Sequence, residues 1–248
     1  MGIDMDKMRA KLSALQNKSD KKSVFWRPQD GEQTIRIVPT PDGDPFKEYW
    51  FHYNVGNNPG FLSPKKNFGQ DDPLDNFVRS LFKEGSDESI KMAKNLMARQ
   101  RFFAPVIVRG EENEGVRLWG FGKTAYQELL NLVLNPDYGD ITDVEEGTDL
   151  VLTYGKPPGA QFPQTSITPR RRPSRLMETD EAVAHALDSV PEFESVFERK
   201  TPEQVQEMLD QYLLGDADAE EVSSETSKYD NNSASTNAVD QAFQELLG

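Results

Sequence analysis

The sequence predicts a mainly β core, a small five-stranded barrel with helical additions, and three observations support this prediction. Between residues 24 and 168 the chain breaks into short β-type runs separated by Gly, Pro and Asp, which is typical of small closed or partly open barrels. The 248 residues suffice for one domain of moderate size with appendages. Without any cysteine, neither a disulfide scaffold nor a cysteine-ligated metal can replace a hydrophobic core.

The order of the predicted elements fits an oligonucleotide-binding (OB) fold. We expect strands at residues 33–38, 47–55, 101–109, 116–121 and 149–154. A helix should follow the fourth strand, because Thr124 and Gln127 have the spacing of a capping box and Leu129 and Val133 fall at core spacing. A single helix before the last strand is the arrangement expected of an OB-fold core.

The remaining segments are predicted to be helices around one long loop. Residues 57–75 show no periodicity and are rich in Gly, Pro, Asn and Lys, so we expect an irregular excursion. Helices are expected at 75–82, 86–97, 179–190 and 201–214. The last should begin at the cap Thr201, stop at Gly215 and pack its apolar stripe on the barrel.

The charge is distributed unevenly and divides the chain into three parts. Residues 1–175 hold 25 basic and 24 acidic side chains, whereas residues 176–248 hold 3 basic and 18 acidic ones. We predict a basic N-terminal arm at 1–22 for self-association, a core at 23–215, and a disordered acidic tail at 216–248. The residues assigned to self-association are Lys7, Arg9 and Lys11, and those assigned to partner proteins are Phe243, Leu246 and Leu247.

The hairpin expected at 101–123 interleaves aromatic rings with arginines. Alternate strand residues share a face, so Arg117, Trp119 and Phe121 should point one way. Bases stack on aromatic rings for about 1–3 kcal/mol each while guanidinium groups contact phosphates, which indicates a single-stranded DNA (ssDNA) surface. The alternative is that these rings are core residues. The flanking arginines favour stacking by Trp119 and Phe103.

Two further basic segments extend the predicted DNA-binding set. Four arginines fall within six residues at 170–175, beside prolines that exclude a helix, and a basic pair lies in the excursion. The full set at this point is Lys65, Lys66, Arg99, Arg101, Phe103, Arg117, Trp119, Phe121, Lys123, Phe162, Arg170, Arg171 and Arg172.

No recognisable catalytic or phosphate-loop motif is present, so we do not expect an enzyme. His52, Asp72 and Asp75 could converge on a metal ion, as in a metal-dependent nuclease, but helix capping explains the aspartates better. A protein-only adaptor is the other alternative. No apolar run reaches the length of a membrane span, so we expect no membrane partner.

The stretch RFFAPVIV, then NEG, then VRLWGFGK before an amphipathic helix resembles the ssDNA-binding (helix-destabilising) protein of T-even-type bacteriophages. The resemblance extends more loosely to PFKEYWFH, to DLVL and to the acidic tail ending in QELLG. It implies an OB fold, cooperative coating of ssDNA, replication and recombination partners, and the cytoplasm of an infected bacterium. It adds Phe102 to the predicted DNA-binding residues. Family members hold zinc with one histidine and three cysteines; here His52 has no cysteine partner, so we expect no zinc.

The acidic tail is expected to compete with DNA for the basic surface, because both are polyanions. Deleting residues 216–248 should therefore raise the affinity for oligo-dT at low salt, as measured by fluorescence anisotropy. An unchanged affinity would contradict this role of the tail.

Overall fold

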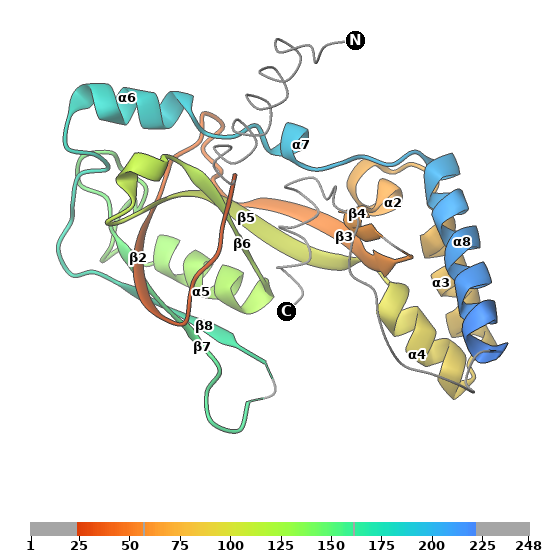
Figure 1. Ribbon diagram of the computed structural model, residues 1–248. Coiled ribbons are helices and arrows are strands. Elements are labelled where there is room, and N and C mark those ends of the chain that lie inside the picture. The colour runs from red at the N-terminus through yellow and green to blue at the C-terminus, as the bar shows by residue number, and fades with distance from the viewer. Residues whose placement is uncertain (1–23, 57, 161, 222–248) are drawn as a thin grey trace, which may run out of the picture.

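One sheet of eight strands organises the described part of the chain (Figure 1). The structure is a computed structural model and describes residues 24–56, 58–160 and 162–221. The predicted arm residues Lys7, Arg9 and Lys11 and the tail residues Phe243, Leu246 and Leu247 lie outside these ranges. The strands are β1 Phe25–Trp26, β2 Gly31–Ile37, β3 Lys47–Val55, β4 Asn58–Leu62, β5 Arg99–Val108, β6 Arg117–Phe121, β7 Leu150–Gly155 and β8 Gln164–Pro169.

β5 is the central strand of this sheet. It pairs antiparallel with β6 through residues 102–106, and on its other edge with β3 and then β2. The main path of the sheet runs β1-β6-β5-β2-β7-β8, and the β3–β4 hairpin branches from β5. Within the described residues no pairing closes this path into a ring, so the closed barrel expected from the sequence is not shown. All five predicted strands are present, and the fold is mixed α/β rather than mainly β.

The helices cover both faces of the sheet and one of its ends. Five of the described helices begin with a side-chain cap, from Ser63, Asp72, Ser86, Thr179 or the predicted cap Thr201, as short polar residues at this position favour. No helix in the described ranges combines the length and apolar character needed to cross a membrane. The helices are α2 Pro64–Phe68, α3 Pro73–Glu84, α4 Asp87–Leu96, α5 Lys123–Val133, α6 Asp180–Asp188, α7 Phe193–Val196 and α8 Pro202–Glu221.

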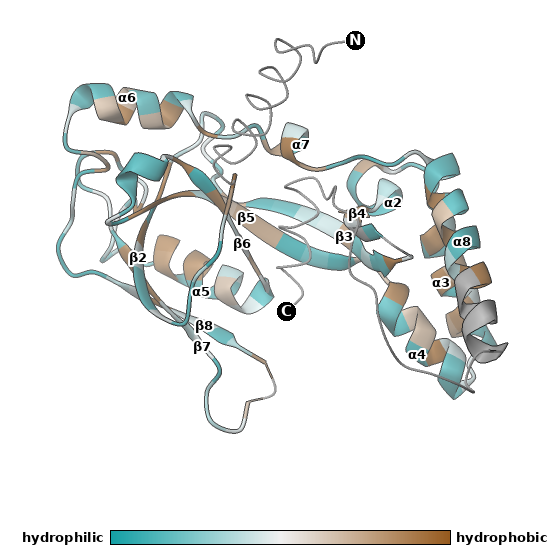
Figure 2. Ribbon diagram, in the orientation of Figure 1, coloured by the Kyte–Doolittle hydropathy of each residue, from teal (hydrophilic) through white to brown (hydrophobic). Residues whose placement is uncertain are grey.

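The hydrophobic half of β5 is buried on both faces. Phe102, Ala104 and Val106 lie in the cluster that α5 covers through Ala125 and Leu129. On the opposite face, side chains from α6, α7 and the residues around them cover β5. Figure 2 shows the change along this strand, hydrophilic where it begins next to α4 and hydrophobic toward β2.

A separate helical cluster packs at the end of the β3–β4 hairpin. Its core joins α3, α4 and α8, with Leu74, Leu96 and Val205 fully or almost fully buried. The apolar stripe of α8 therefore packs mainly on α3 and α4, and it meets the predicted barrel strands only at Val55, near the end of the β3–β4 hairpin. The reason is that the β3–β4 hairpin brings its own apolar residues, Val55 and Phe61, to this helical layer.

Three local predictions are wrong. The excursion at 57–75 contains β4 and α2 instead of irregular chain. Thr124 lies inside α5, whose N-cap is Gly122. Gly215 does not end the last helix, because α8 continues to Glu221 through a stretch of Asp, Ala and Glu that tolerates one glycine.

The position of α8 can be tested with two leucines on that helix. Leu209 is 4% exposed in the helical cluster, whereas Leu214 is 69% exposed. Leu209→Ala should lower the free energy of unfolding by about 2–5 kcal/mol, and the control Leu214→Ala should change it by less than about 0.5 kcal/mol. Urea denaturation followed by circular dichroism measures both values, and equal effects would argue against this packing.

Candidate nucleic-acid interface

The four aromatic rings predicted to stack on bases are core residues. Phe102 and Phe121 are each 3% exposed, Trp119 is 1% exposed and Phe103 is fully buried. Trp119 packs against Trp26 and Phe121 with ring-centroid distances of 6.4 and 4.4 Å. The prediction of an exposed stacking surface at these four rings is therefore wrong. Alternation in a strand places rings on a face but cannot tell whether a helix or loop covers it.

The register of the hairpin explains how the rings are divided. Trp119 lies opposite Ala104 and Phe121 opposite Phe102, so these rings share the face under α5. Phe103 lies opposite Gly120 on the other face, where it packs with Phe197 at a centroid distance of 4.8 Å. Trp119 and Phe103 therefore cannot form one stacking surface. The pairing from 102 to 106 is continuous, so no bulge brings them together.

Arg99 and Arg101 begin β5, and Arg101 lies beside Gly122, the residue before Lys123 at the start of α5; we call these three cations the basic cluster. A Cβ placed on Gly122 would meet only the Nη1 atom of Arg101, at 4.0 Å, so the surface beside Gly122 is open. None of the three cations has an acidic partner among the described residues. The Nε of Arg101 is buried and makes no hydrogen bond within the described structure. Burial raises the pKa of Tyr53 to about 12, although both arginines act in the opposite direction.

Most other arginines are matched to carboxylates. Arg117 is bound to Glu111 at 2.6 Å, which removes it from the free cations predicted from the sequence. Arg79 is bound to Asp75, also at 2.6 Å, and Arg199 to Glu194 at 2.7 Å. The basic cluster therefore differs from these residues in its lack of acidic neighbours.

Of the predicted pair Lys65 and Lys66, only Lys66 lies over Trp50, a residue that the sequence did not single out. The ammonium of Lys66 lies 5.3 Å from the centre of the Trp50 ring, while Lys65 contacts Asp75 at 3.5 Å. The signal was present in the alternation of β3, which puts Trp50 opposite Gln100 and away from Phe51. The sequence could not show that α2 would carry Lys66 over to that strand.

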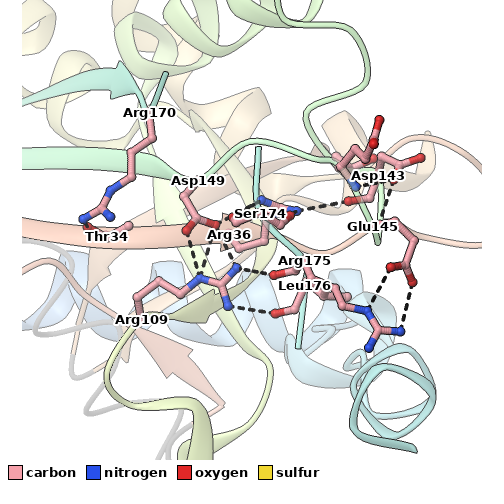
Figure 3. A network of polar contacts seen from close by, with 12 residues as sticks. Thr34, Arg36, Arg109, Asp143, Glu145, Asp149, Arg170, Ser174, Arg175 and Leu176 are labelled. Carbon is pink, nitrogen blue, oxygen red and sulfur yellow. Dashed lines mark hydrogen bonds and ion pairs between the residues drawn. The ribbon is translucent and has the colours of Figure 1, made fainter. Parts of the chain in front are cut away.

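The arginine run at 170–175 is held in place by a buried charge network (Figure 3). Asp149 accepts hydrogen bonds from Arg36 at 3.0 Å and from Arg109 at 2.8 to 3.2 Å. The same two arginines donate to the backbone carbonyls of Ser174, Arg175 and Leu176. Burial lowers the pKa of Arg36, partly offset by Asp149. The network fixes the segment that follows β8.

Within that run only part of the predicted set is available to a ligand. Arg170 donates to Thr34 Oγ1 at 3.1 Å, and Arg175 pairs with Glu145 and Asp180. Arg171 and Arg172 are exposed and have no acidic partner within residues 24–221 as described. This run contacts Arg109 just after the end of β5, whereas the basic cluster lies where β5 begins, so the run forms a second basic group. Phe162 is 68% exposed and lies in the loop between β7 and β8, at the opposite end of β8 from this run.

His52 and Asp72 form a buried pair inside the helical cluster instead of a metal site. His52 Nδ1 lies 2.8 Å from the carbonyl of Leu96, and its Nε2 lies 3.1 Å from Asp72 Oδ2. Ser63 donates to the same Oδ2 at 2.6 Å, and Asp75 turns away to Lys65 and Arg79. The zinc that the resemblance suggests does not fit, because both ring nitrogens are engaged and no cysteine exists.

No group of three or more potential metal ligands occurs in the part of the chain that the structure describes. Asp72 caps α3 by accepting a hydrogen bond from the backbone of Asp75 at 3.2 Å, as predicted for an aspartate here. Burial opposes ionisation of Asp72, but hydrogen bonds from His52, Ser63 and Asp75 lower its pKa to about 2.

Comparisons with known proteins give no relative. No protein-family model matches the chain, and a search of curated proteins finds no matching sequence.

The buried hydrogen bonds of Asp72 make the free energy of unfolding depend on pH in a defined range. The pKa of Asp72 is about 2 in the folded protein and about 3.9 in an unfolded chain, so its stabilisation is complete above about pH 4. That stabilisation is lost as the pH falls from about 3.9 through about 2. Asp72→Asn should lower the free energy of unfolding at pH 7 by about 3 kcal/mol.

The difference in free energy of unfolding between Asp72→Asn and the wild type should become smaller as the pH falls from about 3.9 to about 2. Urea denaturation between pH 7 and pH 2 measures this difference. Asp71→Asn is the matched control, because Asp71 is exposed and should show neither effect. A difference that stays constant down to pH 2 would contradict the assignment.

Proposed function

We propose that this protein binds ssDNA, chiefly through contacts between its unpaired cations and the phosphate backbone. The observation that carries the proposal is the basic cluster of Arg99, Arg101 and Lys123, which has no acidic partner within the described chain, although acids outnumber bases in the sequence. Cations kept free of carboxylates can release the counterions of a polyanion, and this release is the main source of affinity for nucleic acids.

Preference for a single strand needs more than phosphate contacts, because these contacts carry no information about the bases. Exposed rings can supply it, since unpaired bases stack on them and paired bases cannot. Phe162, which was in the predicted set, is a large exposed ring of this kind. Binding only to the melted strand would favour strand separation by mass action, without nucleotide hydrolysis.

The finer parts of the proposal rest on the sequence resemblance. In it, β2, β3, β5, β6 and β7 with α5 correspond to a five-stranded OB-fold core, and the chain coats ssDNA cooperatively during phage replication, recombination and repair. Its setting would be the cytoplasm of an infected bacterium. The arm would serve self-association, and the tail would recruit replication and recombination proteins.

The phosphate contacts can be tested by salt titration. The affinity for fluorescein-labelled oligo-dT should fall linearly with the logarithm of salt concentration, with a slope of about −0.7 per neutralised phosphate. The double variant Arg99→Gln, Arg101→Gln should bind more weakly and reduce this slope by about 1 to 1.4 units.

Arg79→Gln is the control, because Arg79 is exposed and paired with Asp75. It should leave both the affinity and the slope of the wild type unchanged. Absence of oligo-dT binding by the wild type, or a slope near zero, would sink the proposal and favour the protein-only adaptor.

A further inference from the structure

The three tryptophans of the chain lie in different environments. Trp26 and Trp119 are 6% and 1% exposed and belong to the core cluster under α5. Trp50 is partly exposed and belongs to none of the buried core clusters within the described chain. Its opposite residue on β5 is Gln100, so Trp50 lies on the face of Gln100, whereas Arg99 and Arg101 point to the other face of the sheet. Among the three tryptophans, Trp50 is the one whose ring a ligand can reach, beside α2.

The Trp50 ring makes polar contacts that a ligand can replace. Its Nε1 donates to Glu48 Oε1 at 2.9 Å, and Glu48 is exposed. Lys66 lies over the ring at 5.3 Å from the centroid, and its side chain is exposed at the surface. A cation over an exposed ring contributes only about 0.5–1 kcal/mol, so it can turn to a stronger anionic partner.

The backbone that carries the ring is fixed from two sides. Asn67 Oδ1 accepts from the Trp50 backbone nitrogen at 3.0 Å, and Asn67 Nδ2 donates to the Trp50 carbonyl at 2.7 Å. Ser63 donates its backbone N–H to the same carbonyl at 2.9 Å. These contacts hold β3 to α2, so the ring has a defined position before a ligand binds. A positioned ring loses little conformational entropy on stacking.

We propose that Trp50 is a base-stacking platform and that Lys66 contacts the phosphate of the nucleotide stacked there. This inference rests on the proposed function and adds a stacking site on β3 and α2 to the phosphate contacts of the basic cluster. Aromatic stacking paired with a nearby cation is the combination that single-stranded nucleic acid requires. The two elements that build the platform, β3 and α2, are joined by the Asn67 contacts, so ring and cation are presented together.

If the Trp50 ring had only a structural role, substituting it would change stability and not ligand binding. The contacts that join β3 to α2 come from the backbone of Trp50 and not from its ring. Substituting the ring should therefore preserve the fold while removing the platform. This separation makes the proposal testable with variants of one residue.

The experiment combines tryptophan fluorescence with anisotropy of labelled oligo-dT. In the wild type, binding should quench tryptophan fluorescence. Trp50→Phe should retain most of the affinity, because phenylalanine also stacks, but should lose the quenching. Trp50→Ala should bind about 5- to 150-fold more weakly, which corresponds to the loss of one stacked base. Lys66→Gln should reduce the salt slope by about 0.7.

Trp119→Phe is the matched control, because Trp119 is buried in the core. It should keep the quenching and, provided that circular dichroism shows a folded protein, the affinity. Quenching that survives in Trp50→Phe, or wild-type affinity in Trp50→Ala, would overturn the platform while leaving ssDNA binding intact. No binding of oligo-dT by the wild type in the anisotropy channel would instead overturn the proposed function, and this inference with it.

Discussion

β5 is paired along both edges and buried on both faces, and the rest of the described structure is arranged around it. β6 occupies one edge, and β3 and β2 follow each other along the other. Because both faces of Phe102–Val108 are apolar, α5 must cover one side and the segment around α6 and α7 the other. The strand reaches the surface at Arg99–Arg101, so a ligand of this strand has to approach at its beginning.

This burial limits which side chains can take part in the proposed ssDNA interface. The rings of the β5–β6 hairpin are part of the hydrophobic core. One of them, Phe102, stacks on Tyr126 of α5 with ring centroids 3.9 Å apart and so holds this helix on the sheet. The proposed ssDNA interface therefore draws its affinity from cations at the edge of that core and its base stacking from rings outside it, Trp50 and Phe162. An interface of this kind is governed by counterion release and should be strongly salt-dependent.

Two buried polar groups hold the parts that flank the sheet. In the helical cluster, Asp72 Oδ2 lies 3.1 Å from His52 Nε2 and accepts a hydrogen bond from Ser63. Near β8, Asp149 lies between Arg36 and Arg109 and holds the following segment in place. Removing one member of such a group leaves a buried charge without a partner, which is far more costly than losing a surface ion pair.

Sequence alone determined the local elements, because the periodicity of apolar residues and the capping chemistry act over a few residues. All five predicted strands are present, and Asp72 and Thr201 cap α3 and α8 as predicted. Only the tertiary structure decided three other features. These are the burial of the second face of β5 under α7, the ion pair of Arg117 with Glu111, and the contact of Lys66 with the Trp50 ring. Exposure depends on which distant segment packs over a face, and an alternating strand pattern reads the same whether that face is covered or open.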